Sequence, residues 1–261
     1  MKLSLDGVAI IAKEETGGNI MATFETGKKM YIEHFGFADG ISQPRYFNED
    51  RRTSATDLQP LNIVLVKDPF TNPAGEHYGS FLVYRKLEQD VEGFNKKIAE
   101  LAGHLNLNAN QDGKITREDF AGALIVGRFK DGTPLVKSDI TLGESPAFND
   151  FKYEHTDRMA HKCPFHSHIR KSNPRGQGLL VAEKGRYITR RGVPYGKQDE
   201  EGKKGLLFMC FQSNLKRQFT LIQKKWVNAP SFPPFRGKPG LDPLIGQGDE
   251  GGQSWPKQYG S

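Results

Sequence analysis

Two stretches of the chain carry apolar residues at helical spacing. Between Glu88 and Leu105 they fall at Val91, Phe94, Ile98, Leu101 and Leu105. Intervals of three and four residues place them on one helical stripe, which predicts an amphipathic helix. A second helix is predicted from Arg117 to about Val126.

Strand-like runs are predicted at Asn62–Val66 and at Ser80–Arg85, each bounded by Pro, Gly or Asp. The run 205–212, GLLFMCFQ, is continuously apolar, which is typical of a strand buried on both faces. Ser213 or Asn214 is expected to cap a following helix, whose apolar face carries Leu215, Phe219, Ile222 and Trp226. Residues 132–162 are predicted to be a long loop, and the Pro- and Gly-rich part after Ala229 to be extended or loosely packed. This order of elements favours an α+β fold.

Composition narrows the class of protein. With 261 residues and 36% hydrophobic residues, the chain can bury a core, and disorder of the whole is excluded. The net charge of +6 comes without a block of interleaved basic and aromatic residues, so no nucleic-acid partner is expected. Two cysteines exclude a disulfide framework. The apolar runs are too short for a membrane helix, and residues 1–10 do not form a secretory signal, so no membrane partner and a cytoplasmic location are expected.

The densest chemical feature is a cluster of histidines, in which His155, His161, His166 and His168 lie within fourteen residues. One hypothesis is zinc held by His161, Cys163, His166 and His168, although Pro164 and the tight spacing do not match the usual paired-ligand pattern. A second is one axial histidine for a haem iron, with nearby Arg and Lys pairing the propionates. A third is a basic loop with solvated histidines.

Two further motifs bear candidate chemistry. In GFADG, residues 36–40, Asp-Gly indicates a turn, and the apolar neighbours of Asp39 could make it an acid/base group. In RRGVPYG, residues 190–196, the arginines either are solvated beside a strand that ends in a Gly-Pro turn or include one aimed at a ligand.

Five segments in register resemble the dye-decolorizing peroxidases. In order they are IEHFGFADGISQP, GSFLVYRKLEQDVEGF, CPFHSHIRKSNPRG, RRGVPYG and GLLFMCFQSNLKRQF, and GQGDEGGQSWPKQYG fits the tail of the family's longer members. The resemblance runs from about Tyr31 to the C-terminus. It implies haem b in a ferredoxin-like α+β fold with an antiparallel sheet, and reducing substrates such as dyes and phenols oxidised by hydrogen peroxide.

By position in these motifs, the resemblance makes His168 the proximal iron ligand, Asp39 the distal acid/base group and Arg190 the distal arginine. The expected roles are proton transfer by Asp39 and stabilisation by Arg190 of the charge that develops as the O–O bond breaks, with an acidic activity optimum. Strand alternation puts Leu206, Phe208 and Cys210 on one face, and the resemblance places Leu206 and Phe208 over the distal haem face, with core packing as the alternative. Candidate propionate partners are Arg85 and Arg175. Trp226, Tyr187 and Tyr195 could relay electrons or simply pack.

The chain departs from the family pattern at both ends. Only thirty-five residues precede Gly36, where the family carries most of a first ferredoxin-like half, and a final apolar strand is lacking. We therefore expect residues 1–60 to be a remnant of the first half carrying the Gly-x-x-Asp-Gly motif, and residues 61–261 to be the haem-binding second half. Open sheet edges then leave three alternatives: another chain (a homo-oligomer or a complementing chain) supplies the missing strands, this is a shortened form, or haem retention is poor. The rival function is a non-enzymatic or partner-dependent haem-binding remnant.

Residues 108–119 resemble an EF-hand calcium loop, with Gly113 at the sixth position. Asn108 replaces the first aspartate of that pattern and Asp119 replaces the bidentate glutamate. A plain helix-turn-helix is the alternative.

Overall fold

The computed structural model describes residues 20–24, 27, 29–48, 58–70, 77–143, 149–177, 183, 185–197, 202–234, 237–248 and 253–260. Its central element is an antiparallel sheet of β5 (Phe81–Glu88), β7 (Gly205–Gln212) and β6 (Thr189–Tyr195), in the order β5-β7-β6. The described parts also contain two small two-stranded sheets. One joins β1 (Met21–Thr23) to β2 (Lys29–Tyr31), and the other joins β3 (Val66–Lys67) to β4 (Tyr78–Gly79).

Strand positions follow from the sequence. The continuously apolar segment 205–212 forms a strand, as predicted, and this strand lies between β5 and β6 in the sheet. Strand β6 runs through Pro194 to Tyr195 rather than ending in a turn before it. Among the described residues β6 is an edge strand of this sheet, with β7 as its neighbour. Proline is tolerated in an edge strand because the N–H that it lacks is not needed on the side without a neighbouring strand.

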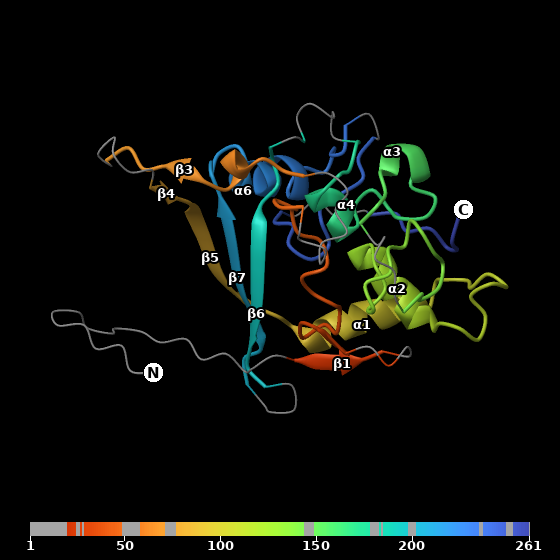
Figure 1. Cartoon of the computed structure of the whole chain (residues 1–261). Coiled ribbons are helices and arrows are strands. Elements are labelled where there is room, and N and C mark those ends of the chain that lie inside the picture. The colour runs from red at the N-terminus through yellow and green to blue at the C-terminus, as the bar shows by residue number, and fades with distance from the viewer. Residues whose placement is uncertain are drawn as a thin grey trace.

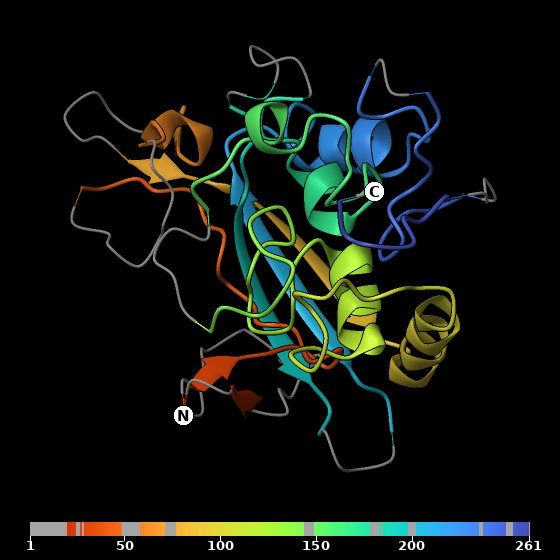
Figure 2. The same cartoon turned by 90° about the vertical axis from the view of Figure 1, so that its right-hand side faces the viewer.

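The helices α1 (Val91–Ala102) and α2 (Arg117–Val126) form at the two places where helices were predicted. Asp90 caps α1 by accepting a hydrogen bond from the Gly93 N–H, and Thr116 and Asp119 form a reciprocal capping box at α2. Phe94 and Ile98 of α1 pack with the wholly buried residues of α2 into the main core. Figures 1 and 2 show α1, α2 and the short helix α4 (His168–Ser172) on the same side of the three-stranded sheet.

Three local predictions were wrong. The strand predicted at 62–66 is absent except for Val66, which begins β3. Pro60 instead precedes a 3-10 helix, η1 (Leu61–Ile63), because a proline fixes φ at a value suited to the start of a helical turn. The predicted helix after Asn214 begins only at α6 (Phe219–Leu221) and continues as a π-helix, η2 (Ile222–Val227). Leu215, which was predicted to lie on the apolar face of this helix, is exposed. In the same segment Gln218 is buried, and its side-chain amide donates to the carbonyls of Ile63 and Tyr187.

Burial also differs from the prediction in two places. The part after Ala229 is not loosely packed throughout, since Leu241 and Asp242 are buried. Strand β7 is not buried on both faces, because Phe211 is 38% exposed. The loop at 132–162 is largely a loop, as expected, but it contains the short helix α3 (Tyr153–Thr156), whose Tyr153 is fully buried.

The fold class is confirmed as α+β with antiparallel sheets. Phe37, from the GFADG segment, belongs to the same buried cluster as α1 and α2. The division at residue 60 stays a prediction, and much of 1–60 lies outside the described residues. Within the described ranges, no helix is long and apolar enough to cross a membrane.

Candidate active site

The GFADG segment brings Asp39 to strand β6. Gly36 and Gly40 have φ of +89° and +78°, a conformation that glycine adopts without strain, and these two glycines bracket the turn. The Gly40 N–H donates to Asp39 Oδ1 at 2.6 Å. A Cβ on Gly192 would lie 2.6 Å from Asp39 Oδ2, so Asp39 packs directly over this position of β6.

A second carboxylate, which sequence reasoning missed, holds this turn. Glu33 accepts hydrogen bonds from the N–H groups of Phe35 and Phe37, each at 2.9 Å, and one from the side-chain amide of Gln89. Burial raises the pKa of the Glu33 carboxyl, although these hydrogen bonds lower it, and the charge of Asp39 adds to the rise. The sequence signal is weak: a carboxylate three residues before a glycine turn. The rings of Phe35 and Phe37 pack against Phe94 of the core.

Arg190 lies on the same face of the sheet as the position that Asp39 covers. In β6 it is two residues from Gly192, and alternate residues of a strand share a face. The side-chain amide of Gln43 donates to the Arg190 carbonyl at 2.9 Å, and its oxygen accepts from the Arg190 N–H at 3.1 Å, as a neighbouring strand would. The guanidinium of Arg190 donates to the Ser42 carbonyl at 2.7 Å.

Leu206 and Phe208 complete this face. Phe208 pairs with Gly192, and a Cβ on Gly192 would lie 3.2 Å from Leu206 Cδ1. Strand β5 lies along the other edge of β7, and its Arg85 pairs with Phe208, so that the two side chains share this face. Arg85 donates to the Gln223 side chain of η2 at 3.4 Å. The structure thus places Asp39, Arg190, Leu206, Phe208 and Arg85 on one side of one sheet.

Three arginines from separate segments are joined by hydrogen bonds to Ser42 and Asn149. Arg175 donates to Ser42 Oγ at 3.1 Å and to the Asn149 carbonyl at 2.8 Å. Arg128, which sequence reasoning missed, donates to Asn149 Oδ1 at 2.7 Å, and Arg190 reaches Ser42 as described. None of these hydrogen bonds involves a carboxylate.

Positive charge is therefore concentrated here. Burial, followed by the charge of Arg175, lowers the pKa of Arg128 to about 9. Burial also lowers the pKa of Arg175, with a smaller contribution from Arg190. The buried Arg175 Nε has no hydrogen-bond partner, and the Arg175 guanidinium lies 4.2 Å from the Phe151 ring centroid. Such a cluster fits an anionic group.

His168 begins α4 and is oriented by a buried aspartate. Its Nδ1 lies 2.8 Å from Asp242 Oδ2, and the Asp242 side chain is fully buried. Burial alone would raise the pKa of the Asp242 carboxyl, but the charge and hydrogen bond of His168, with the N–H groups of Ile245 and Leu244, hold that pKa below its usual range. This contact leaves Nε2 of His168 for another ligand. Sequence reasoning missed Asp242, which lies 74 residues further along the chain.

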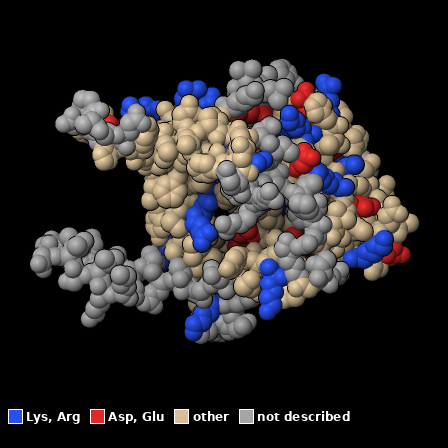
Figure 3. Space-filling view, viewed as in Figure 1, with Lys and Arg blue, Asp and Glu red and all other residues tan. Residues whose placement is uncertain are grey.

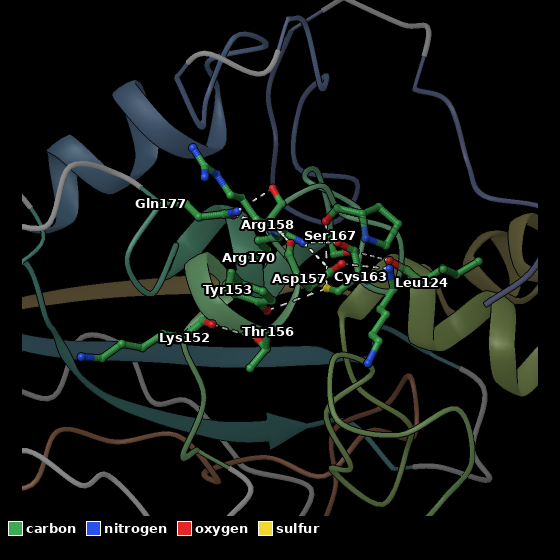
Figure 4. A network of polar contacts seen from close by, with 12 residues as sticks. Leu124, Lys152, Tyr153, Thr156, Asp157, Arg158, Cys163, Ser167, Arg170 and Gln177 are labelled. Carbon is green, nitrogen blue, oxygen red and sulfur yellow. Dashed lines mark hydrogen bonds and ion pairs between the residues drawn. The ribbon is translucent and has the colours of Figure 1, made fainter. Parts of the chain in front are cut away.

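A dense polar network fixes the loop around His168 (Figure 4). The fully buried Arg170 forms an ion pair with Asp157 Oδ2 at 2.9 Å and also donates to the carbonyls of Asp157 and Cys163 and to the Gln177 side chain. The Cys163 N–H donates to Asp157 as well. Buried charges require this degree of pairing, and the result is that the segment from Asp157 to Cys163 is tied to helix α4, which carries His168.

The alternative zinc set is not assembled. Among the described residues no group of three or more His, Cys, Asp or Glu side chains could hold a metal ion. His161 is exposed, whereas the buried Cys163 contacts Tyr153 and His166 packs edge-on against Trp255 at 4.3 Å. Burial lowers the pKa of His166 to about 4, so this histidine is neutral at physiological pH.

The geometry is less favourable to two other hypotheses from the sequence: an electron relay through aromatic residues and a calcium site in the EF-hand-like segment. Trp226 is buried and stacks on Phe232, Tyr195 is buried beneath Lys86, and Tyr187 is half-buried. In the EF-hand-like segment, the Asp119 carboxylate accepts hydrogen bonds from the N–H and hydroxyl of Thr116, as part of the helix cap. This use of the Asp119 carboxylate fits the plain helix-turn-helix better than a calcium loop.

The donor set fits a haem. His168, whose Nδ1 and not Nε2 contacts Asp242, could hold the iron of a haem, and the arginine cluster with its unpartnered Arg175 Nε suits the two carboxylates of a porphyrin. Leu206 and Phe208 provide half-buried apolar surface on the sheet that carries Asp39 and Arg190.

Residues 32–231 match the family description "Dyp-type peroxidase, C-terminal". The chain is 41% identical over 255 residues to a multifunctional dye peroxidase of Amycolatopsis sp., covering 88% of this chain and 53% of the relative. A dye-decolorizing peroxidase of Mycetinis scorodonius is 34% identical over 250 residues, covering 84% of this chain and 47% of the relative. The crystal structure of a DyP-type peroxidase from Anabaena sp. superposes with a TM-score of 0.79 at 42% identity, covering 93% of this chain and 53% of that one. The chain spans about half the length of these relatives, and it belongs to the Dyp-type peroxidase family.

Proposed function

We propose that the chain forms the haem-binding part of a peroxidase that uses hydrogen peroxide to oxidise dyes, phenols and other small reducing substrates. The observation that carries this proposal is the joint placement of Asp39 and Arg190 on one sheet face, with Arg190 linked through Ser42 to Arg175. The relatives named as dye peroxidases support it.

His168 would hold the iron of haem b through Nε2, and Arg175, with Arg85 as a further candidate, would pair the propionates. The hydrogen bond to Asp242 fixes the ring orientation and makes His168 a stronger electron donor. When bound, haem supplies the redox chemistry that accepts electrons from substrate and passes them to peroxide.

The chain's own residues handle protons and charge. Asp39 accepts one peroxide proton at its carboxylate and returns it to the departing oxygen, which leaves as water. The Arg190 guanidinium stabilises the negative charge that develops on that oxygen as the O–O bond breaks. Two substrate molecules each give one electron, so that one peroxide, two protons and two electrons yield two waters. We expect an acidic optimum, because proton transfer by a carboxylate is central.

The rival function is partner-dependent haem binding without turnover, which the half-length match to the relatives favours. Haem titration monitored by the Soret band, followed by dye oxidation with peroxide, separates the two. We expect a Soret band that His168→Ala abolishes, and turnover that Asp39→Asn and Arg190→Leu each reduce at least ~100-fold, as for loss of a general base or an electrostatic stabiliser. A normal Soret band without turnover favours the rival, and an unchanged band in His168→Ala contradicts the axial role.

A further inference from the structure

The loop that follows the GFADG turn runs along the outer edge of strand β6. Among the described residues β6 has a neighbouring strand, β7, on one side only. An edge of this kind presents backbone N–H and carbonyl groups that no strand binds. The Tyr46 hydroxyl lies 2.6 Å from Thr189 Oγ1, and the Arg190 guanidinium donates to the Ser42 carbonyl at 2.7 Å. Residues 42–46 therefore cover the edge of β6 at the position of Arg190.

Gln43 binds this edge as a paired strand would. Its side-chain amide donates to the Arg190 carbonyl at 2.9 Å, and its Oε1 accepts from the Arg190 N–H at 3.1 Å. In an antiparallel ladder two facing residues exchange both of these bonds, and an amide side chain can replace one of them because it offers a donor and an acceptor. Gln43 also precedes Pro44, and the residue before a proline is restricted to extended backbone. This restriction favours an extended loop beside the strand.

The same pair of bonds relates Arg190 to Asp39. Asp39 lies four residues before Gln43 in the chain and packs over Gly192, which is two residues from Arg190 in β6. The loop thus carries the carboxylate at its start and holds the backbone of the arginine further along. Figure 3, in the same view as Figure 1, shows basic and acidic side chains at the rim of a hollow beside β6, so charges of both signs reach the surface here.

We propose that Gln43 is a positioning residue for the reaction with peroxide. Its amide fixes the Arg190 backbone against the loop that carries Asp39, so that the carboxylate and the guanidinium meet the same peroxide molecule. A displacement of about 1 Å can cost about 100-fold in rate, which is why a tie between the two groups matters. The inference rests on the proposed function, because it gives Asp39 and Arg190 the roles stated there. The alternative is a merely structural role, in which Gln43 only closes the edge of β6.

The first test uses the full chain without haem and follows hydrogen exchange of the Arg190 N–H by NMR. Gln43→Met keeps the length of the side chain and removes both hydrogen bonds, and the fold should tolerate the change because Gln43 is half-buried. We expect the Arg190 N–H to exchange about tenfold faster in this variant, as for loss of one hydrogen bond. Equal exchange in wild type and Gln43→Met overturns the proposal.

The matched control is Gln111→Met. The Gln111 amide donates to the Asp139 carbonyl at 3.1 Å and accepts from the Asn108 N–H at 2.9 Å, which is the same bonding pattern in another part of the chain. Its loss should lower the unfolding midpoint while exchange of the Arg190 N–H stays unchanged.

The second test uses the haem-loaded chain and compares activity per folded molecule. We expect Gln43→Met to lower the rate constant for reaction with hydrogen peroxide at least ~10-fold, with the KM for the reducing dye unchanged, and Gln111→Met to alter neither. An unchanged rate constant in Gln43→Met overturns the proposal in favour of the merely structural role. An inactive wild type contradicts the proposed function instead, and the Arg190 N–H in the haem-free chain then decides the inference about Gln43.

Gln43→Glu supplies a readout that loss of stability does not imitate, and it serves if Gln43→Met fails to fold. An ionised carboxylate can only accept, whereas a protonated carboxyl both donates and accepts as the amide does. Activity relative to wild type at the same pH should therefore rise as pH falls through the pKa of the introduced carboxyl, about 4.3 for an unperturbed glutamate. Arg190 and Arg175, which both donate to Ser42, favour the ionised form, so the rise is expected at or below this pH. A ratio that does not rise, or that rises equally in Gln43→Met, contradicts the proposal.

Discussion

Asp242 has two roles, which replacement by asparagine separates: it accepts hydrogen bonds from the backbone and it orients His168. Asp242 Oδ1 accepts hydrogen bonds from the N–H groups of Leu244 and Ile245 at 2.8 and 3.0 Å, while Oδ2 faces His168 Nδ1. Asparagine keeps the volume and the Oδ1 acceptor. Its NH₂ group, however, faces the imidazole where an anionic acceptor stood, so two donors meet unless His168 changes tautomer.

The expected cost follows from burial. A hydrogen bond to a charged group contributes about 1.5–3 kcal/mol, and the fully buried Asp242 side chain is at the upper part of this range. Removing a partner of this kind typically weakens metal binding about 10–100-fold, and we expect a similar loss of haem affinity through His168. Because the folded-state pKa of Asp242 is lowered, its stabilisation is fully present above the ordinary aspartate pKa of about 3.9 and is lost as pH falls through the lower folded value.

The assay combines urea unfolding at pH 7 and pH 3 with haem titration at pH 7. The wild type should exceed Asp242→Asn in unfolding free energy by about 2.5 kcal/mol at pH 7 and by less at pH 3. Asp131→Asn is the control: Asp131 is 2% exposed and accepts hydrogen bonds from Thr133 and Gly143, so stability should fall while haem affinity is kept. Equal haem affinity in wild type and Asp242→Asn would refute the reasoning.

Three further changes test other parts of the structure. Gly192→Ala should displace Asp39 and lower peroxide turnover at least ~10-fold with the Soret band retained, whereas Gly79→Ala, where a Cβ meets nothing within 4 Å, should be neutral in the same assay. Burial lowers the pKa of Lys171 to about 8, so wild-type stability should rise between pH 8 and about 10.4, and urea midpoints of Lys171→Met should lack this rise. Arg170→Met should cost about 3–5 kcal/mol in unfolding free energy because it leaves a buried carboxylate unpaired, and a loss below 1 kcal/mol would contradict the network's role.

The local pattern of apolar and polar residues was enough to predict some of the helices and strands. The stripe of α1, the bounds of α2 and the apolar run of β7 could all be predicted, because each depends on neighbours a few residues away. Residues 61–67 and 214–227 could not. There Pro60 starts a 3-10 turn, and the buried Gln218 bonds to carbonyls of two distant segments, which no periodicity reveals.

The sequence by itself determined the family, the α+β class and the candidates His168, Asp39 and Arg190, because these lie in short motifs with fixed spacing. The tertiary structure alone decided their partners: Asp242 on His168, Gly192 beneath Asp39, and Arg128 beside Arg175. The physical reason is that the burial of a side chain, its hydrogen-bond partners and the charges around it depend on which distant segments come together in the fold. Short sequence motifs do not specify those long-range contacts.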